Sequence, residues 1–419
     1  MGTTPSAWIQ PRGTAPALLV KVVAMVNASP LHSPAARARL ISPATWALLL
    51  GAWVVVGLFS FYGASWLAAP LTPGVAGLSF AVLLATIVAA SFGVVHEADY
   101  LAHKLGEPYG TLILTLSIVS IEVILIASVL LGPGEAPTIG RDSIFAVLMI
   151  ILNLVMGICL TVGAARHGEQ EFNAQGATAY LSMIALLTTV ALVLPKFTST
   201  AGEFGPEQAM GIGVLTALLY AAFLWKQIGS HKRLFVQPPP GAMVVRRMER
   251  TSRAPTETEK AEGSVQQSRK DVWVHSLLLL AMIVPIVLLG HHLAVVLDYG
   301  IAAAGAPVAV SGVLIALIVF TPESLTAVRA ALGNEMQRAV NLCLGAFVST
   351  VGLTVPAVLA IGLLYDKQVV MGISHMDTAL FVATAVLSML TFNGQRTSAL
   401  QGYMHLALFA VFAVLLFFP

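Results

Sequence analysis

The chain has 419 residues, of which 57% are hydrophobic and 10% are charged, and its formal net charge is +2. Soluble domains carry roughly 25% charged residues, so the composition excludes an ordinary soluble protein and predicts one that crosses a membrane several times. Such a small net charge gives no reason to expect a nucleic-acid partner.

The first 43 residues form a basic, proline-containing tail with Arg12, Lys21, Arg37 and Arg39. The short apolar piece 15–26 is interrupted by Lys21, and no small-residue cleavage site follows it, which argues against a cleaved signal peptide. We therefore expect a partly disordered cytoplasmic tail.

Apolar segments long enough to cross a bilayer follow the tail, because about 20 helical residues span about 30 Å. There are eleven, at 44–63, 73–95, 110–131, 142–164, 177–195, 207–228, 272–298, 307–328, 339–363, 374–392 and 398–418. The predicted fold class is an all-α polytopic membrane protein with about 11 transmembrane helices.

Lysine and arginine are concentrated in alternate loops, which sets the expected orientation. The tail and the loops around Lys104, Arg166, Arg329 and Arg396 fall on one side, together with the basic loop 229–271. The loops on the other side contain few basic residues. We expect this protein in a bacterial inner membrane, with its N-terminus cytoplasmic and its C-terminus outside.

Loop 229–271 is polar, proline-rich and charged with both signs, so it is interpreted as a flexible cytoplasmic linker. A regulatory or lipid-headgroup contact through its basic residues is the alternative. The linker divides the chain into the tail 1–43, an extra first span 44–72, a first half 73–228 and a second half 272–419.

Two spans carry a glutamate where an apolar residue is expected: Glu122 in 110–131 and Glu323 in 307–328. A carboxylate in the middle of a bilayer costs at least ~2.5–3.5 kcal/mol, and no basic residue lies deep in any span to pair with it. We interpret the two glutamates as one midplane site for a cation and protons. A snorkelling or structurally paired carboxylate is the alternative.

The glutamates also reveal a repeat. Without the first span, each half contains five spans, and the second span of each half carries the glutamate. The expected orientation makes these two spans run in opposite directions. Two inverted repeats of five spans, with a substrate site between them, are typical of secondary transporters.

Polar residues near the glutamates are candidate pore-lining groups, because carboxylate, amide and hydroxyl oxygens bind hard cations. Hydrogen bonds from the hydroxyls to their own helix are the alternative. Pro322 is expected to kink or break its helix and to free the carbonyl of Ile318, although packing alone can also require a kink. The candidates are Ser120, Asn153, Thr321, Asn341, Ser349, Thr350 and Thr354.

The motif HEADYLAH places His96, Glu97, Asp99 and His103 at the end of the second span. Its histidine spacing does not match the HExxH motif of zinc proteases. A pH- or cation-sensing entrance is one interpretation, because histidine titrates near neutral pH. A polar helix end with capping carboxylates is the other.

The stretches HEADYLAHKLGEPYGTLILTLSIVSIEV (96–123) and TPESLTAVRAALGNEMQRAVNLCLGAFVSTVGLTVP (321–356) resemble the calcium/cation antiporter superfamily. The similarity is greatest to its ChaA-type sodium(potassium) or calcium/proton antiporters. This resemblance implies that Glu122 and Glu323 bind the cation and exchange it for protons, and that Asn153 lines the pore.

The broader superfamily has a Gly-Asn-Ala-Thr-Glu type motif around each glutamate. Here Ile118–Ile121 and Val319–Pro322 stand in its place, which removes ligands expected for calcium and favours a monovalent ion. A calcium-selective calcium/proton exchanger remains an alternative.

We therefore predict a secondary antiporter that exports sodium, potassium or calcium in exchange for protons by alternating access, and a passive cation channel is the alternative. No nucleophile–base set indicates an enzyme, and nothing indicates a cofactor. Cys159 and Cys343 lie in apolar runs without the spacing of a metal site. The expected partners are the cation, protons and the lipid bilayer.

Overall fold

The computed structural model describes residues 42–68, 70–105, 109–132, 136–198, 202–238, 264–307, 309–394 and 396–418. Nearly all of them are helical, and β-structure among them is limited to two isolated bridges. Most of the predicted tail and the linker residues 239–263 lie outside the described part of the chain.

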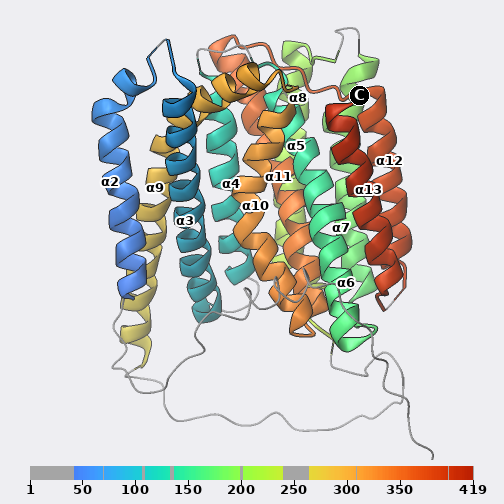
Figure 1. The fold of residues 1–419 in the computed structure, drawn as a ribbon. Coiled ribbons are helices and arrows are strands. Elements are labelled where there is room, and N and C mark those ends of the chain that lie inside the picture. Colours follow the sequence, from blue (N-terminus) through green and yellow to red (C-terminus); the bar gives the residue numbers. More distant parts are fainter. Residues whose placement is uncertain are drawn as a thin grey trace, which may run out of the picture. The chain divides into compact units, whose positions relative to one another are not determined.

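The helices correspond in number and order to the eleven predicted spans (Figure 1). Ten helical spans in the described residues are long and apolar enough to cross a membrane, and α4 contains a shorter apolar segment, Leu116–Leu130. These spans are α2 (Pro43–Trp66), α3 (Pro73–Leu105), α4 (Tyr109–Leu130), α5 (Ile139–Met149) continued by the π-helical η1 (Ile150–Val155) and α6 (Met156–His167), α7 (Ala174–Thr188), α8 (Pro206–Ile228), α9 (Ser264–Ala304), α10 (Ala309–Leu332), α11 (Met336–Tyr365), α12 (His375–Phe392) and α13 (Ala399–Phe417).

Two sets of five spans, α3 to α8 and α9 to α13, make up the bundle. Helices α3 and α9 begin at opposite ends of it, so the sets run in opposite directions (Figure 1). Their contacts also correspond: α4 packs on α11 as α10 packs on α5, and α8 packs on α11 as α13 packs on α6. The predicted inverted repeat is therefore present, with α2 added against α3 and α9.

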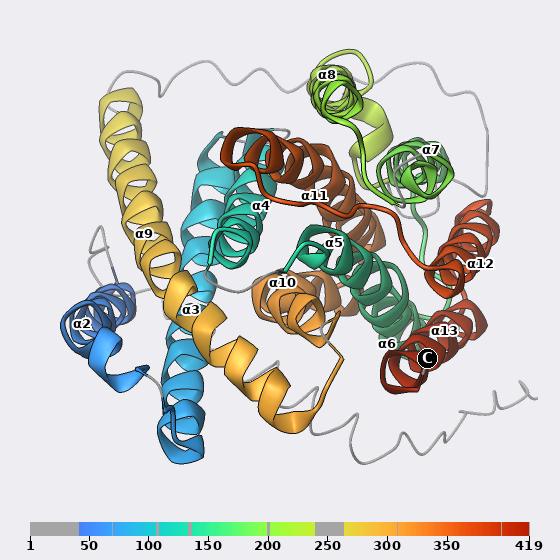
Figure 2. The same ribbon diagram turned by 90° about the horizontal axis from the view of Figure 1, so that it is seen from above.

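The two glutamate-bearing helices lie near the centre of this arrangement. Seen along the bundle, α5 and α10 lie near its centre, with α4 and α11 beside them (Figure 2). The span α5–η1–α6 is the most enclosed, with nearly all of its side chains buried. On α4 and α10, the glutamate side chains are among those that are buried.

We call the end of the bundle at which α3, α6, α8, α10 and α12 terminate the linker end. Part of the predicted linker is ordered there: Lys232–Phe235 form a short 3-10 turn, and α9 already begins at Ser264. The Asn341 side-chain amide donates to the Phe235 carbonyl oxygen at 2.6 Å, which attaches this turn to α11. Residues 232–235 and 264–271 of the predicted linker are thus helical.

Candidate functional site

The centre of the bundle contains both glutamates. Glu122 lies on α4 and Glu323 on α10, and their side chains are 0% and 3% exposed. The two helices contact each other, and the Glu122 carboxylate is close enough to Glu323 to act on it electrostatically. The structure therefore brings the two predicted residues together, one from each half.

The hydrogen bonding of the two carboxylates is incomplete. The Thr350 hydroxyl on α11 donates to Glu122 Oε2 at 2.7 Å. Glu122 Oε1 and both carboxylate oxygens of Glu323 are buried without a hydrogen-bond partner in the described structure. A carboxyl group at such a position is stable only when it is protonated or when a positive charge lies close by.

No cationic side chain supplies that charge within the described residues, where every ion pair involves other carboxylates. The unpartnered oxygens are hard donors of the kind that sodium, potassium and calcium ions bind. The arrangement fits a cation or protons as a transported substrate.

Pro322 precedes Glu323 within α10, and the helix continues through it. Since proline has no N–H group, the Ile318 carbonyl lacks its usual helical donor. The helix is therefore not broken at this point, and one backbone oxygen near Glu323 lacks that hydrogen bond.

Among the predicted supporting hydroxyls, only Thr350 contacts a glutamate. Ser120 and Thr321 donate to carbonyls one turn earlier in their own helices, Leu116 at 2.6 Å and Leu317 at 2.5 Å. Ser349 does the same with Gly345 and also accepts from the Tyr220 hydroxyl at 2.8 Å. Local backbone bonding therefore accounts for these three serine and threonine residues.

Thr354 lies one turn beyond Thr350 on α11, and its hydroxyl is not bonded to its own helix as those of Ser120, Thr321 and Ser349 are. Its hydroxyl is buried and has no hydrogen-bond partner among the described residues. The usual bond back to its own helix is missing there, so this oxygen remains available beside the glutamate-bonding turn.

Asn153 lies in the π-helical turn η1, and its side chain is paired with residues other than the glutamates. Its amide nitrogen donates to Thr384 at 2.9 Å, and its amide oxygen lies 3.1 Å from Nδ1 of His405. The other ring nitrogen of His405 lies 3.1 Å from the Thr391 hydroxyl. All four side chains are buried, so they form a closed polar network between η1, α12 and α13.

Sequence reasoning did not identify His405 as part of this network. The sequence shows His405 only as a lone histidine inside an apolar span, which does not indicate its partners. The predicted pore-lining Asn341 lies at the linker end, where it bonds Phe235 and accepts from Gln337 at 2.8 Å.

The residues of the HEADYLAH motif point to different partners. Glu97 is buried and pairs with His275 on α9 at 2.5 Å, and Asp99 pairs with Arg338 on α11 at 3.8 Å. His96 is exposed, and the His103 side chain lies outside the described residues. The motif thus joins α3 to two other helices at the linker end.

Metal-type clusters of three or more His, Cys, Asp or Glu residues do not occur in the described part of the chain. Cys159 and Cys343 are both buried as free thiols.

Comparisons with known proteins match this architecture. The family model for "sodium/calcium exchanger protein" matches residues 75–229 and 274–418, which correspond to the two sets of five spans and exclude α2. The y4hA protein of Sinorhizobium fredii, named as an ionic transporter, is 35% identical over 337 residues, covering 80% of this chain and 87% of that protein.

The sodium-potassium/proton antiporter ChaA of Escherichia coli is 31% identical over 352 residues, covering 84% of this chain and 92% of that protein. Among solved structures, native YfkE superimposes with a TM-score of 0.65 at 18% identity, covering 89% of this chain and 100% of that one. The likeness to YfkE concerns the fold alone.

Proposed function

The chain belongs to the sodium/calcium exchanger protein family and is an integral membrane transporter, and from this premise we propose that it exchanges a monovalent cation, sodium or potassium, for protons. Glu122 and Glu323 are the groups that bind both. The linker end lies on the cytoplasmic side of a bacterial inner membrane. The loops at this end contain most of the lysine and arginine residues, as expected for cytoplasmic loops.

One observation supports this proposal most strongly: three carboxylate oxygens of the two glutamates are buried without a hydrogen-bond partner in the described structure. Two ionised carboxylates in a low-dielectric interior repel each other and lose their hydration, so they need protons or a cation. Since both ligands use the same oxygens, each displaces the other. Exchange follows when the loaded site alternates between the two sides of the membrane.

The surroundings of the glutamates favour a monovalent ion. Calcium takes about 6–8 oxygen ligands, often from several carboxylates. Here the hydroxyls of Ser120 and Thr321 are bonded to their own helices, and Thr350 is the neutral side chain bonded to Glu122. The similarity to an antiporter named for sodium and potassium points the same way.

The test is proton flux through purified protein in sealed proteoliposomes, with sodium, potassium or calcium offered singly. We expect sodium or potassium to drive proton movement in the opposite direction. Calcium-driven flux alone would identify a calcium/proton exchanger instead. Cation flux without proton countertransport would identify a channel and contradict the proposal.

A further inference from the structure

A cavity of about 430 Å³ lies at the end of the bundle opposite the linker end. It is formed where α5, α10 and α12 begin and where α13 ends, and this end of the bundle faces the viewer in Figure 2. Helix α5 belongs to the first set of spans and the other three to the second, so the two halves meet at this cavity. Neither central glutamate lines it.

The polar groups of the cavity lie at its rim. They are Thr138, Arg141 and Asp142 at the start of α5, and Ser374 and Asp377 at the start of α12. The charged groups among them are one guanidinium and two carboxylates. The rim therefore presents both signs of charge to a ligand.

The deeper walls of the cavity are apolar. Phe145, Val313 and Phe412 lie one to two turns inside the helix ends, or roughly 6–9 Å at the helical rise of about 1.5 Å per residue. The rings of Phe145 and Phe412 pack edge to face with centroids 5.9 Å apart, which joins α5 to α13. One turn beyond Val313 on α10, Leu317 is 37% exposed. Apolar surface thus continues from the cavity along α10 toward the middle of the bundle.

Two charged groups at the rim each keep one bonding position unused. Arg141 Nε donates to Asp142 Oδ1 at 2.9 Å and Nη1 donates to the Gly372 carbonyl oxygen at 2.7 Å, while Nη2 has no partner among the described residues. Asp377 Oδ2 accepts from the Ser374 hydroxyl at 2.7 Å, while Oδ1 has no partner among them. Both oxygens of Asp142 are already bonded. The cavity thus offers one cationic donor and one anionic acceptor.

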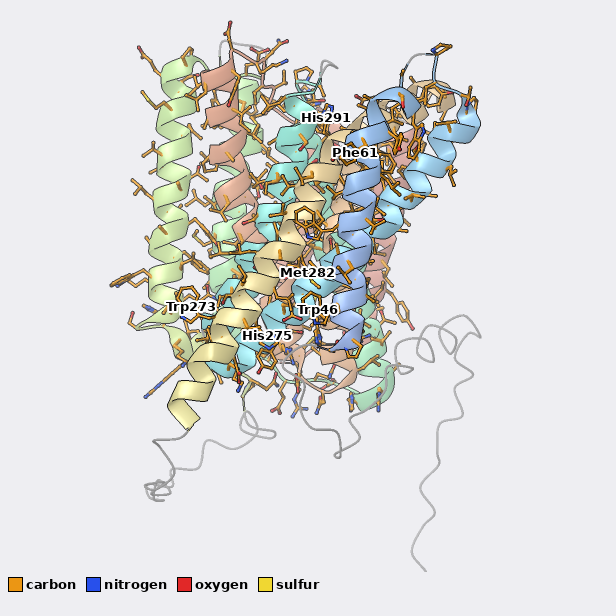
Figure 3. The ribbon with its side chains drawn as sticks, turned by 90° about the vertical axis from the view of Figure 1, so that its left-hand side faces the viewer. Trp46, Phe61, Trp273, His275, Met282 and His291 are labelled. Atoms are coloured by element: carbon orange, nitrogen blue, oxygen red, sulfur yellow. The ribbon has the colours of Figure 1, made fainter. Side chains whose placement is uncertain are left out.

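Aromatic side chains indicate where the membrane surfaces lie. On the face formed by α2 and α9, Trp46 and Trp273 lie toward the linker end and Phe61 lies toward the opposite end (Figure 3). Tyr62 and Trp66 follow Phe61 at that end, and all five rings are exposed. Exposed tryptophan and tyrosine are typical of the two surfaces of a bilayer. The rim of the cavity, also at the helix ends, therefore lies at the level of the lipid headgroups, and its apolar walls lie within the hydrocarbon.

A lipid whose headgroup contains both a phosphate and an ammonium group matches these features. Arginine binds phosphate through its guanidinium N–H groups, and an ammonium group donates charge-assisted hydrogen bonds to a carboxylate. An acyl chain is the complement of an apolar wall at hydrocarbon depth. A metal cation alone does not match, because Arg141 repels it at the rim and the deeper walls carry no oxygen ligands.

We propose that this cavity binds a zwitterionic aminophospholipid. Its phosphate lies at Arg141, its ammonium group lies at Asp377, and one acyl chain follows Val313 and Leu317. The bound chain contacts α10, the helix that carries Glu323. Lipid binding at this place does not depend on which cation the protein exchanges.

The test is native mass spectrometry of the purified, delipidated full-length protein, titrated with phosphatidylethanolamine, phosphatidylcholine or phosphatidylglycerol with identical acyl chains. We expect the first bound phosphatidylethanolamine to have an affinity up to about fivefold higher than phosphatidylglycerol, the factor that corresponds to about 1 kcal/mol for a partly exposed ion pair. Phosphatidylcholine should lie between them, because its quaternary ammonium is charged and has no N–H group to donate.

Two variants test the headgroup and the chain separately. Asp377→Asn should lose the preference for phosphatidylethanolamine over phosphatidylglycerol, whereas Glu207→Gln, in the first turn of α8 at the same end, should keep it. Val313→Trp fills the apolar part of the cavity and should weaken binding of all three lipids. Its matched control is Val214→Trp on α8, where the native side chain is 55% exposed, and it should bind lipids as the parent does.

Equal affinities of the parent protein for the three lipids would overturn the proposed lipid site, and so would a preference for phosphatidylethanolamine that persists in Asp377→Asn. Unchanged binding in Val313→Trp would place the lipid elsewhere and contradict the proposal as well. If Val313→Trp does not fold, the comparison of Asp377→Asn with Glu207→Gln decides. Because the readout is lipid binding, an absence of cation/proton exchange would refute the proposed function alone.

Discussion

The two central glutamates have unequal surroundings. Glu122 receives a hydrogen bond from Thr350, whereas both oxygens of Glu323 lack a partner in the described structure. Glu323 also experiences the Glu122 and Asp99 carboxylates. In this sealed arrangement Glu323 has two carboxylate oxygens without a hydrogen-bond partner among the described residues, and Glu122 has one.

Replacement of either glutamate by glutamine should abolish coupled exchange. Glu122→Gln and Glu323→Gln remove the charge that binds the cation and the proton that is exchanged, while they keep the shape of the side chain. Proton flux in proteoliposomes measures the loss, and thermal unfolding should show a protein at least as stable as the parent, because a buried charge is gone. The control is Glu207→Gln at the exposed start of α8. Full exchange in either central variant would contradict the site.

Thr350 should tune the affinity of the site. Thr350→Val removes the hydroxyl at nearly constant shape, and a hydrogen bond to a charged group contributes about 1.5–3 kcal/mol. We expect apparent cation affinity to fall by about ten- to hundredfold, since about 1.4 kcal/mol is a factor of ten. Thr350→Ser should restore it, and Ser120→Ala, which loses only a local helix bond, should have little effect. Equal apparent cation affinities of Thr350→Val and Thr350→Ser would show that the Thr350 hydroxyl does not take part in cation binding.

At the scale of single elements, a proline in α9 explains how the extra helix α2 is attached. Pro285 has no N–H group to donate to the Ala281 carbonyl, and the Trp53 indole of α2 donates to that oxygen at 3.2 Å. The proline thus creates an acceptor on the surface of α9 that a neighbouring helix uses.

Trp53→Phe should therefore weaken the attachment of α2 by about 0.5–1.5 kcal/mol, the usual net contribution of a hydrogen bond. Thermal unfolding of the purified protein measures the change. In a Pro285→Ala background the helix can bond Ala281 itself, so the effect of Trp53→Phe should shrink. An equal effect in both backgrounds would show that packing of the indole, rather than its N–H group, is responsible.

The sequence predicts the helices well because each span is a long apolar run. It also singles out Glu122 and Glu323, because a lone carboxylate in such a run is costly, and their role as the cation site stays a prediction. It predicts side-chain partners poorly. Ser120 and Thr321 bond their own helices, a choice that depends on rotamers. Glu97 meets His275 from a distant segment, and no local pattern connects them.

The same limit applies to Asn153 and Asn341. The π-helical turn that presents Asn153 to His405 has no marker in the sequence, because α5, η1 and α6 form one apolar run. Asn341 was expected to line the pore. Instead, its side-chain amide donates to the Phe235 carbonyl oxygen and so attaches the Lys232–Phe235 turn to α11. Polarity within a span thus indicates a hydrogen bond, and the structure is needed to find the partner.

At the scale of the whole molecule, the two halves are joined by the linker 229–271. Both ends of this linker are helical, at Lys232–Phe235 and from Ser264 onward. Deletion of residues 240–262 should leave exchange intact, because this stretch has the polar composition, charged with both signs, of a linker. A longer deletion, of residues 235–262, should reduce stability. It removes the buried Phe235 ring and the Phe235 carbonyl oxygen that accepts a hydrogen bond from Asn341. Flux and thermal unfolding of both deletions decide this. Loss of exchange in the folded shorter deletion would place the linker in the pathway.

The central claim, that cation and proton share the Glu122 and Glu323 carboxylates, is tested most directly by cation affinity measured across pH in the purified protein. We predict that apparent affinity weakens as the pH falls, by up to tenfold per unit for each competing proton, or ~1.4 kcal/mol. The dependence should diminish in Glu122→Gln. A cation affinity in the parent protein that does not change with pH would contradict the shared site.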